Sequence, residues 1–196
     1  MPEDTQLSDS DGVFLVKTAR MAVTEFLSNG KRMKLESEYE KRFSFNSGVF
    51  VTLNNADGLR GCIGFPMPDK KLSHGIIDAA IAAATEDPRF SPVKINELND
   101  IVFEVTVLTS PVEITVTDPM EYLEKIKVGR DGLIIRNSFS SGLLLPQVPV
   151  EYGWNVEEFL QHTCEKAGLE KDTWKNEKVK IEKFEGIVYK EKTNGS

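Results

Sequence analysis

The amino-acid sequence predicts an α+β fold, with a mostly antiparallel sheet flanked by helices and a smaller second lobe. Strand-like segments follow one another as hairpins, and amphipathic helical segments interrupt them. Strands joined by short turns pair antiparallel, and helices between them bury apolar stripes against the sheet. The 196 residues, 40% of them hydrophobic, suit one domain with a sizeable core. We expect this domain at 12–190, with a main lobe of 12–117 and 143–190 and a small lobe of 118–142.

The first helix is predicted after the polar, acidic residues 1–11, which we expect to be a flexible terminus like residues 191–196. Its apolar stripe consists of residues at helical spacing, Leu15, Ala19, Ala22 and Phe26. Ser10 or Asp11 can cap its start, and Gly30 is typical of its left-handed end. The charged residues 31–44 show no clear period and are expected to form a connection or a poor helix.

A hairpin is predicted next, from a strand at 48–53, a turn at 54–58 and a returning strand at 59–64. The turn is rich in Asn, Asp and Gly, which tolerate positive φ angles. The returning strand reads Leu-Arg-Gly-Cys-Ile-Gly and combines a charge, a thiol and two glycines. Glycine weakens a strand and usually marks a bulge or a close backbone approach. The stretch therefore indicates a strand that lets another group come near its backbone.

An alanine-rich helix follows, with Ser73 as its expected N-cap and Ala84 near its end. Its small residues let it pack close to a sheet. Residues 87–92 contain two prolines and are expected to be an extended loop. The clearest strand spans 101–109, where apolar residues alternate between its two faces.

The C-terminal half is predicted to contain shorter elements. We expect a strand at 111–116, a short helix at 119–125, two buried strands at 133–135 and 143–145, and a loop at 146–153. A well-capped helix should follow, because Asn155 and Glu158 form a capping box. The last strand is expected at 178–189.

The charge balance restricts the classes of partner. With 31 acidic and 24 basic residues the formal net charge is −7, so binding to nucleic-acid backbones is unlikely in this protein. No apolar run approaches the roughly 18 residues of a membrane span, and the acidic N-terminus has no signal-peptide pattern. We expect a soluble, cytoplasmic protein without membrane contact, whose two cysteines are reduced.

Cys62 is the first candidate for chemistry. It could be a nucleophile whose thiolate Arg60 favours, or a small buried apolar residue in a tight sheet. In a regular strand Arg60 and Cys62 share a face, and a buried arginine needs a partner. A cleft lined by both side chains avoids that cost.

The histidines offer weaker candidates. His74 lies in the first turn of its helix and could accept a proton from Cys62, or it could be a bystander in a polar turn. His162 and Cys164 are two residues apart and do not share a helical face, so no metal is predicted. Cofactor-binding motifs for phosphates and dinucleotides are absent, and no cofactor is predicted.

The sequence resembles the AMMECR domain family, of archaeal type. The hexapeptide from Leu59 to Gly64 is identical to the hallmark of that family. Further matching segments follow in the same order, at 87–90, 128–133, 142–149, 151–154 and 164–168. Ser91 stands where the family often has proline. The resemblance covers residues 12–189.

The resemblance implies an antiparallel sheet flanked by helices, plus a smaller lobe, with the hallmark near the cleft between them. It implies no established activity. In some genomes a similar domain is fused to, or encoded beside, a Memo-like domain and a radical-SAM-type protein. This context suggests a shared redox or modification pathway.

Two functions are therefore open. The first is a thiol-dependent enzyme, or enzyme component, that acts on a small or peptide substrate. Cys62 would react, Arg60 would anchor an anion, and Glu151 or His74 would carry the proton. The remaining cleft residues would be Leu59, Gly61, Gly64, Arg89, Pro146 and Gln147. The second is a non-catalytic binding or regulatory module for a protein partner.

Overall fold

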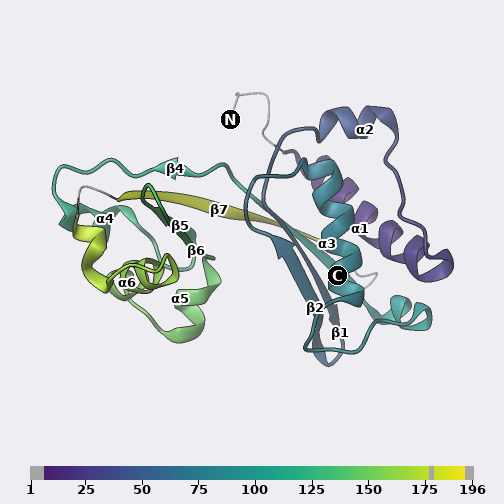
Figure 1. Ribbon diagram of the computed structural model, residues 1–196. Helices are drawn as coiled ribbons and strands as arrows, with labels where there is room; N and C mark the ends of the chain where they lie inside the picture. The colour runs from purple at the N-terminus through teal and green to yellow at the C-terminus, as the bar shows by residue number, and fades with distance from the viewer. Residues whose placement is uncertain (1–6, 177–178, 193–196) are drawn as a thin grey trace. The chain divides into compact units, whose positions relative to one another are not determined.

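The computed structural model describes residues 7–176 and 179–192 and is an α+β protein with an antiparallel sheet (Figure 1). The chain divides into two compact units. Unit 1 comprises residues 1–108 and 187–196, and unit 2 comprises residues 109–186. The sequence placed only residues 118–142 in the smaller lobe. Unit 2 is larger because the strands and helices on both sides of that segment build its core.

Unit 1 carries the longer helices. Its elements are α1 (Asp9–Asn29), α2 (Ser37–Arg42), β1 (Val49–Asn55), β2 (Gly58–Phe65), α3 (Leu72–Thr85), the 3-10 helix η2 (Ile95–Asp100) and β3 (Val102–Leu108). The strand order is β2-β1-β3, followed by the last strand, β7 (Lys180–Lys190), whose final residues belong to this unit. β2 pairs with β1 and β1 pairs with β3, both antiparallel. The predicted hairpin and the predicted third strand are therefore present.

The helix starts differ from the expected ones. Ser8 caps α1 through a capping box with Asp11, so residues 9–11 belong to the helix rather than to a flexible terminus. Gly30 ends the helix with φ 71°, as predicted. α3 begins at Leu72 after Lys71, and Ser73 lies buried in the first turn instead of capping it.

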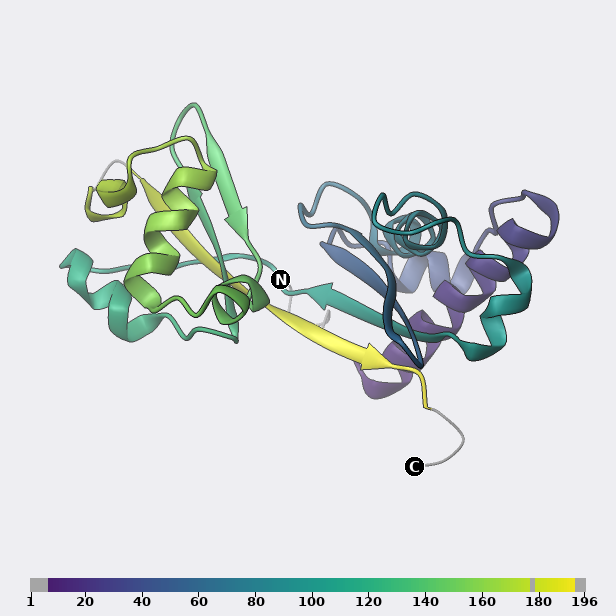
Figure 2. The same ribbon diagram turned by 90° about the horizontal axis from the view of Figure 1, so that it is seen from below.

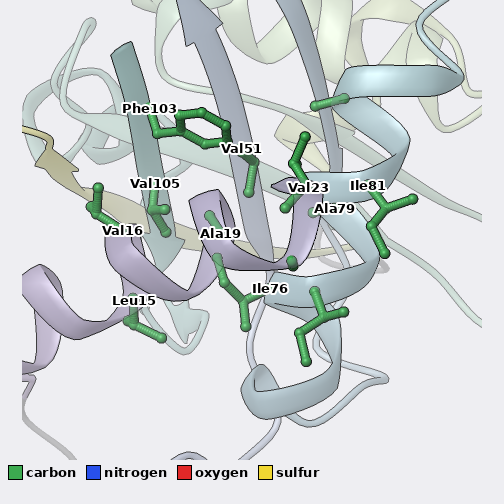
Figure 3. Packing of buried hydrophobic residues seen from close by; sticks show 14 of the residues in the cluster. Leu15, Val16, Ala19, Val23, Val51, Ile76, Ala79, Ile81, Phe103 and Val105 are labelled. Carbon is green, nitrogen blue, oxygen red and sulfur yellow. The ribbon is translucent and has the colours of Figure 1, made fainter. Parts of the chain in front are cut away.

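One face of the unit 1 sheet packs against α1 and α3. Figure 3 shows Leu15 and Ala19 of α1 gathered with Ile76 of α3 and with Val51 and Phe103 of the sheet. Alternate residues of β1 point into this core, so the residues between them belong to the opposite face. This opposite face carries Cys62 and is called the Cys62 face below.

Glu191, which follows β7, is held by hydrogen bonds to α1 and β3. The guanidinium of Arg20 donates to both carboxylate oxygens of Glu191 at 2.6 Å, and the Phe103 N–H donates to the same carboxylate at 3.1 Å. Arg20 also donates to the carbonyls of Leu98 and Ile101. Glu191 is thus held in place, although the sequence assigned it to a flexible terminus; residues 193–196 of that terminus lie outside the described residues.

Unit 2 has its own sheet and core. Its elements are β4 (Val112–Glu113), η3 (Pro119–Glu121), α4 (Tyr122–Lys125), β5 (Asp131–Arg136), β6 (Ser141–Leu144), α5 (Gln147–Tyr152), α6 (Val156–Lys166), η4 (Lys171–Lys175) and the start of β7. β5 pairs with β6 and with β7, and Figure 2 shows α6 lying along this sheet. Residues 147–152 form a short helix where the sequence predicted a loop.

Candidate functional site

Cys62 lies on β2 directly opposite Thr52 of β1. The Sγ of Cys62 and the Oγ1 of Thr52 are 3.3 Å apart and form a hydrogen bond in which either atom can donate. Both side chains are half-buried on the Cys62 face. Cys62 is therefore neither a sealed core residue nor a fully exposed thiol.

The backbone of Cys62 is held at the edge of the sheet. β2 is the terminal strand, and the Cys62 N–H points away from β1 and donates to Oδ2 of Asp87 at 2.8 Å. The guanidinium of Arg89 lies 3.4 Å from the Cys62 carbonyl oxygen and donates a long hydrogen bond to it. The loop after α3 thus pairs with the outer edge of β2, at the residue that carries the thiol.

Asp87 and Arg89 form an ion pair beside the backbone of Cys62. The Asp87 side chain is only 2% exposed and accepts hydrogen bonds from Nε and Nη2 of Arg89 at 3.0 and 2.8 Å. These hydrogen bonds, with that from the Cys62 N–H, hold the pKa of Asp87 far below its usual range, although burial opposes the shift. Arg89 is 55% exposed, so a guanidinium fixed by a buried carboxylate faces solvent beside the backbone carbonyl of Cys62.

Arg60 has a different environment from the one expected. The register of β2 against β1 shifts between Leu53 and Asn54, and Arg60 is the additional residue without a partner on β1. Its guanidinium donates to both carboxylate oxygens of Glu97 at 2.9 and 3.2 Å and to the Ser91 carbonyl at 2.9 Å. The hydrogen bonds from Arg60, together with one from the Lys94 N–H, lower the pKa of Glu97. Arg60 is therefore already neutralised by a carboxylate of the chain.

A shallow pocket of about 480 Å³ adjoins this ion pair. It is lined by residues of β2, of the loop after α3 and of η2, namely Arg60, Phe90, Ser91, Lys94, Asn96 and Glu97. Glu97 and Lys94 bring one charge of each sign to the wall, beside the paired Arg60. Ser91 and Lys94 are the nucleophile types in this lining, and Cys62 is not part of it.

His74 lies at the other end of α3. Its Nε2 is 3.5 Å from a carboxylate oxygen of Glu40, and both side chains are more than half exposed. Asp87, which binds the backbone of Cys62, follows the opposite end of this helix. Fourteen helical residues span about 20 Å, so the structure does not bring His74 to the thiol.

The two glycines of the hallmark hexapeptide serve close packing. A Cβ on Gly61 would lie 2.2 Å from the carbonyl oxygen of Ala83, and a Cβ on Gly64 would meet the ring of Phe50 at 2.3 Å. Gly61 therefore lets α3 approach β2, as the sequence indicated. Leu59, on the same strand, is 41% exposed.

The remaining site candidates belong to unit 2. Pro146 precedes α5, and Gln147 and Glu151 are exposed residues of that helix. The part that these three residues play in a site stays a proposal.

The second cysteine and the second histidine are also residues of unit 2. Cys164 is fully buried in its core, and this burial raises the pKa of the thiol to about 11. His162 shares a hydrogen bond of 2.7 Å with Glu165 and stacks on Trp154. Across the described ranges, 7–176 and 179–192, no group of three His, Cys, Asp or Glu residues could hold a metal ion.

Sequence reasoning missed three residues of this site. Thr52, Asp87 and Glu97 contact Cys62 or Arg60 but come from other elements. The only available signal was the segment Asp87–Arg89, whose carboxylate and guanidinium stand on either side of a proline. In the part of the chain that the structure describes, no helix is long and apolar enough to cross a bilayer.

The fold and the hallmark strand together define an AMMECR-type domain. The chain matches the AMMECR1 family over residues 16–189 and belongs to that family. It is 51% identical over 187 residues to Protein MJ0810 of Methanocaldococcus jannaschii, covering 94% of this chain and 92% of that one. It is 48% identical to Protein PYRAB00100 of Pyrococcus abyssi, covering 95% and 93%.

A solved structure has the same fold. The crystal structure of the uncharacterized protein PH0010 from Pyrococcus horikoshii matches with a TM-score of 0.76 and 48% identity. The match covers 95% of this chain and 94% of that one.

Proposed function

We propose that the chain is a thiol-dependent enzyme, or a component of one, in which Cys62 reacts with a small or peptide substrate. The observation that carries the proposal is the arrangement of Asp87 and Arg89 around Cys62. A buried carboxylate holds both the backbone of the cysteine and a guanidinium that faces solvent beside it. A guanidinium held in this way can bind an anionic group of a substrate beside the cysteine.

The chemistry supported by these contacts is covalent attack by sulfur. The thiolate of Cys62 forms a bond to an electrophilic carbon, and the bond from that carbon to its leaving group breaks with its electron pair. The leaving group then takes a proton. The guanidinium of Arg89 would hold an anionic group of the substrate or the charge that develops on it.

Arg89 fits the role of anion anchor better than Arg60 does. Each guanidinium binds both oxygens of a carboxylate, Arg60 those of Glu97 and Arg89 those of Asp87. Arg60 is only 12% exposed, however, whereas Arg89 is 55% exposed. The proposal drops His74 as the proton carrier, because His74 contacts Glu40 at the far end of α3. The role of Glu151 stays a prediction from the sequence.

Alkylation of the native protein tests the reacting thiol. We expect iodoacetamide to modify Cys62 faster in the native protein than in the urea-unfolded protein, with the site identified by peptide mass spectrometry. Cys164 is an internal control, because a buried thiol with a pKa of about 11 should stay unmodified until the chain unfolds. The proposal fails if Cys62 is alkylated no faster in the native protein than after unfolding.

A comparison of two reagents tests the anion anchor. Iodoacetate carries a negative charge and iodoacetamide does not. An anchoring cation should therefore raise the rate of alkylation by iodoacetate relative to the rate with iodoacetamide. We expect Arg89→Gln to lower this ratio several-fold. Arg60→Gln is the matched control and should leave it nearly unchanged. If only Arg60→Gln lowers this ratio, Arg60 and not Arg89 binds the anion.

A binding or regulatory module is the second candidate function. It is favoured by the contacts of the Cys62 thiol, whose one hydrogen-bonding partner among the described residues is Thr52. The family resemblance suggests a Memo-like protein as the partner. Binding of such a protein that survives Cys62→Ser, together with slow alkylation, would favour this candidate. Filter binding at low salt would test nucleic-acid binding, which the net charge of −7 disfavours.

A further inference from the structure

Three side chains form a row across neighbouring strands of the Cys62 face. Cys62 of β2 lies opposite Thr52 of β1, and Thr52 lies opposite Glu104 of β3. Side chains directly opposite one another in antiparallel strands project from the same face, with Cβ atoms about 4.5–5.5 Å apart. All three side chains are half-buried, so the row is partly accessible to solvent.

We propose that Thr52 and Glu104 activate Cys62, with the Thr52 hydroxyl passing the thiol proton toward the Glu104 carboxylate. The inference rests on the proposed function and adds a proton acceptor to it. The first contact is present, because Thr52 Oγ1 is hydrogen-bonded to Cys62 Sγ at 3.3 Å. The second follows from the strand register, because Glu104 lies directly opposite Thr52 and a side chain of its length can reach across such a pair.

The step balances within these three residues and the electrophile. The Cys62 thiol proton passes to Thr52 Oγ1 while the Thr52 hydroxyl proton passes to the Glu104 carboxylate. The sulfur electron pair forms the bond to carbon, and the leaving group departs with the electron pair of the broken bond. Glu104 returns the proton to the leaving group by the same route. Glu104 acts through Thr52 and is a positioning residue, whereas Cys62 touches the reacting atoms.

Basic residues of unit 1 lie near the two ends of the row. Arg89 donates to the Cys62 carbonyl from the loop after α3 and is paired with Asp87. Arg60, on β2, is paired with Glu97 of η2. On β7, the Glu191 N–H donates to the Phe103 carbonyl, and this bond sets the neighbouring Lys190 opposite Glu104. Arg89 and Lys190 therefore flank the two ends between which negative charge would move.

The rate of Cys62 alkylation at pH 7 distinguishes a proton acceptor from a bystander. If Glu104 accepts the proton, Glu104→Gln should slow the reaction with iodoacetamide about 10-fold or more. The solvent deuterium isotope effect of the wild-type reaction should disappear as well. A carboxylate that is only nearby predicts the opposite sign, because removing a negative charge favours the thiolate. Glu38→Gln, an exposed change on α2, is the charge-matched control and should change neither quantity.

Substitutions of Thr52 test whether its hydroxyl carries the proton. Thr52→Val keeps the shape of the side chain and should slow alkylation as Glu104→Gln does, whereas Thr52→Ser should restore most of the rate. Circular dichroism checks that each variant is folded. If Glu104→Gln does not fold, the rates of Thr52→Val and Thr52→Ser test the relay without it. If wild-type Cys62 is unreactive in the native protein, the proposed function fails. If it reacts and the variants react equally fast or faster, only the relay fails.

Discussion

Gly61 and Gly64 show how single residues set the position of the thiol. Each lacks the Cβ that would collide with a neighbour, Gly61 with the Ala83 carbonyl and Gly64 with the Phe50 ring. Gly61 brings α3 against β2, and α3 in turn places the following Asp87 beside the Cys62 N–H. The glycines therefore act on the site indirectly, through the helix that they admit.

Replacing Gly61 by alanine should destabilise the protein. The new Cβ would lie 2.2 Å from a backbone oxygen, which cannot rotate away, so β2 or α3 must shift. We expect a loss of about 1–3 kcal/mol in the free energy of unfolding, measured by urea titration. Leu59→Ala, at a 41% exposed position of the same strand, is the control and should cost about 0.5 kcal/mol or less. Equal stability of the two variants would contradict the packing role.

At this scale the sequence predicted the special residues but not their partners. The pattern of charge, thiol and glycines singled out Arg60 and Cys62 correctly as neighbours in a strand. The prediction that Arg60 and Cys62 line one cleft assumed a strand with regular alternation of its side chains. The register shift at Arg60 breaks this alternation, and it cannot be recognised from the sequence of one strand alone. Asp87 and Glu97 escaped notice because their contacts join residues 25 and 37 positions apart.

At the scale of elements, α1 and α2 are connected by an ion pair. The Arg42 guanidinium donates to both carboxylate oxygens of Asp11 at 3.2 and 2.7 Å, and Asp11 also completes the capping box of α1. These hydrogen bonds, with that from Ser8, lower the pKa of Asp11 to about 2, against the opposing effect of burial. One carboxylate thus stabilises a helix start and fixes a neighbouring short helix.

Asp11→Asn should reduce stability at neutral pH, by about 1 kcal/mol or less because Arg42 is partly exposed. A carboxyl group with a lowered pKa in the folded state stabilises it above the unfolded pKa of 3.8. That contribution is lost as the pH falls from about 4 to about 2. The difference between wild type and variant, measured by urea titration, should therefore shrink over this range. Asp9→Asn is the control, and an unchanged difference at pH 2 would contradict the ion pair.

The capping patterns predicted some elements well and one element poorly. Asn155 and Glu158 form the expected capping box, and α6 begins where the sequence placed it. The segment around Pro146 and Pro149 was predicted as a loop, yet it contains α5. Pro149 is the third residue of that helix, and the first N–H groups of a helix have no intrahelical acceptor. A proline there costs no hydrogen bond, so two prolines did not exclude a helix.

At the scale of the whole molecule, strand pairing between distant segments decides the division into units. β5 pairs with β7, so residues near 131–136 and 180–185 share one sheet in unit 2. The sequence shows each strand but not which strands pair across 50 residues of chain. For that reason the expected small lobe stopped at residue 142, before the strand and helices that complete its core.

Unit 2 should fold without unit 1. Residues 109–186 contain a separate core in which Trp174, Phe159 and Leu160 are almost fully buried, and a sheet of their own strands. A chain of this length can fold alone when its core is contiguous. We expect a fragment of 109–186 to unfold cooperatively in urea, with a smaller denaturant dependence than the intact protein because it buries less surface.

Tryptophan fluorescence makes this measurement specific. Both tryptophans of the chain, Trp154 and Trp174, lie in unit 2, so fluorescence follows this unit in the fragment and in the intact protein alike. Trp174 is 1% exposed and should emit at short wavelength in the folded fragment. Phe159→Ala, a core truncation, is the control and should lower the midpoint of the fragment. A fragment with solvent-exposed emission and no cooperative transition would mean that the unit 2 core depends on the rest of the chain.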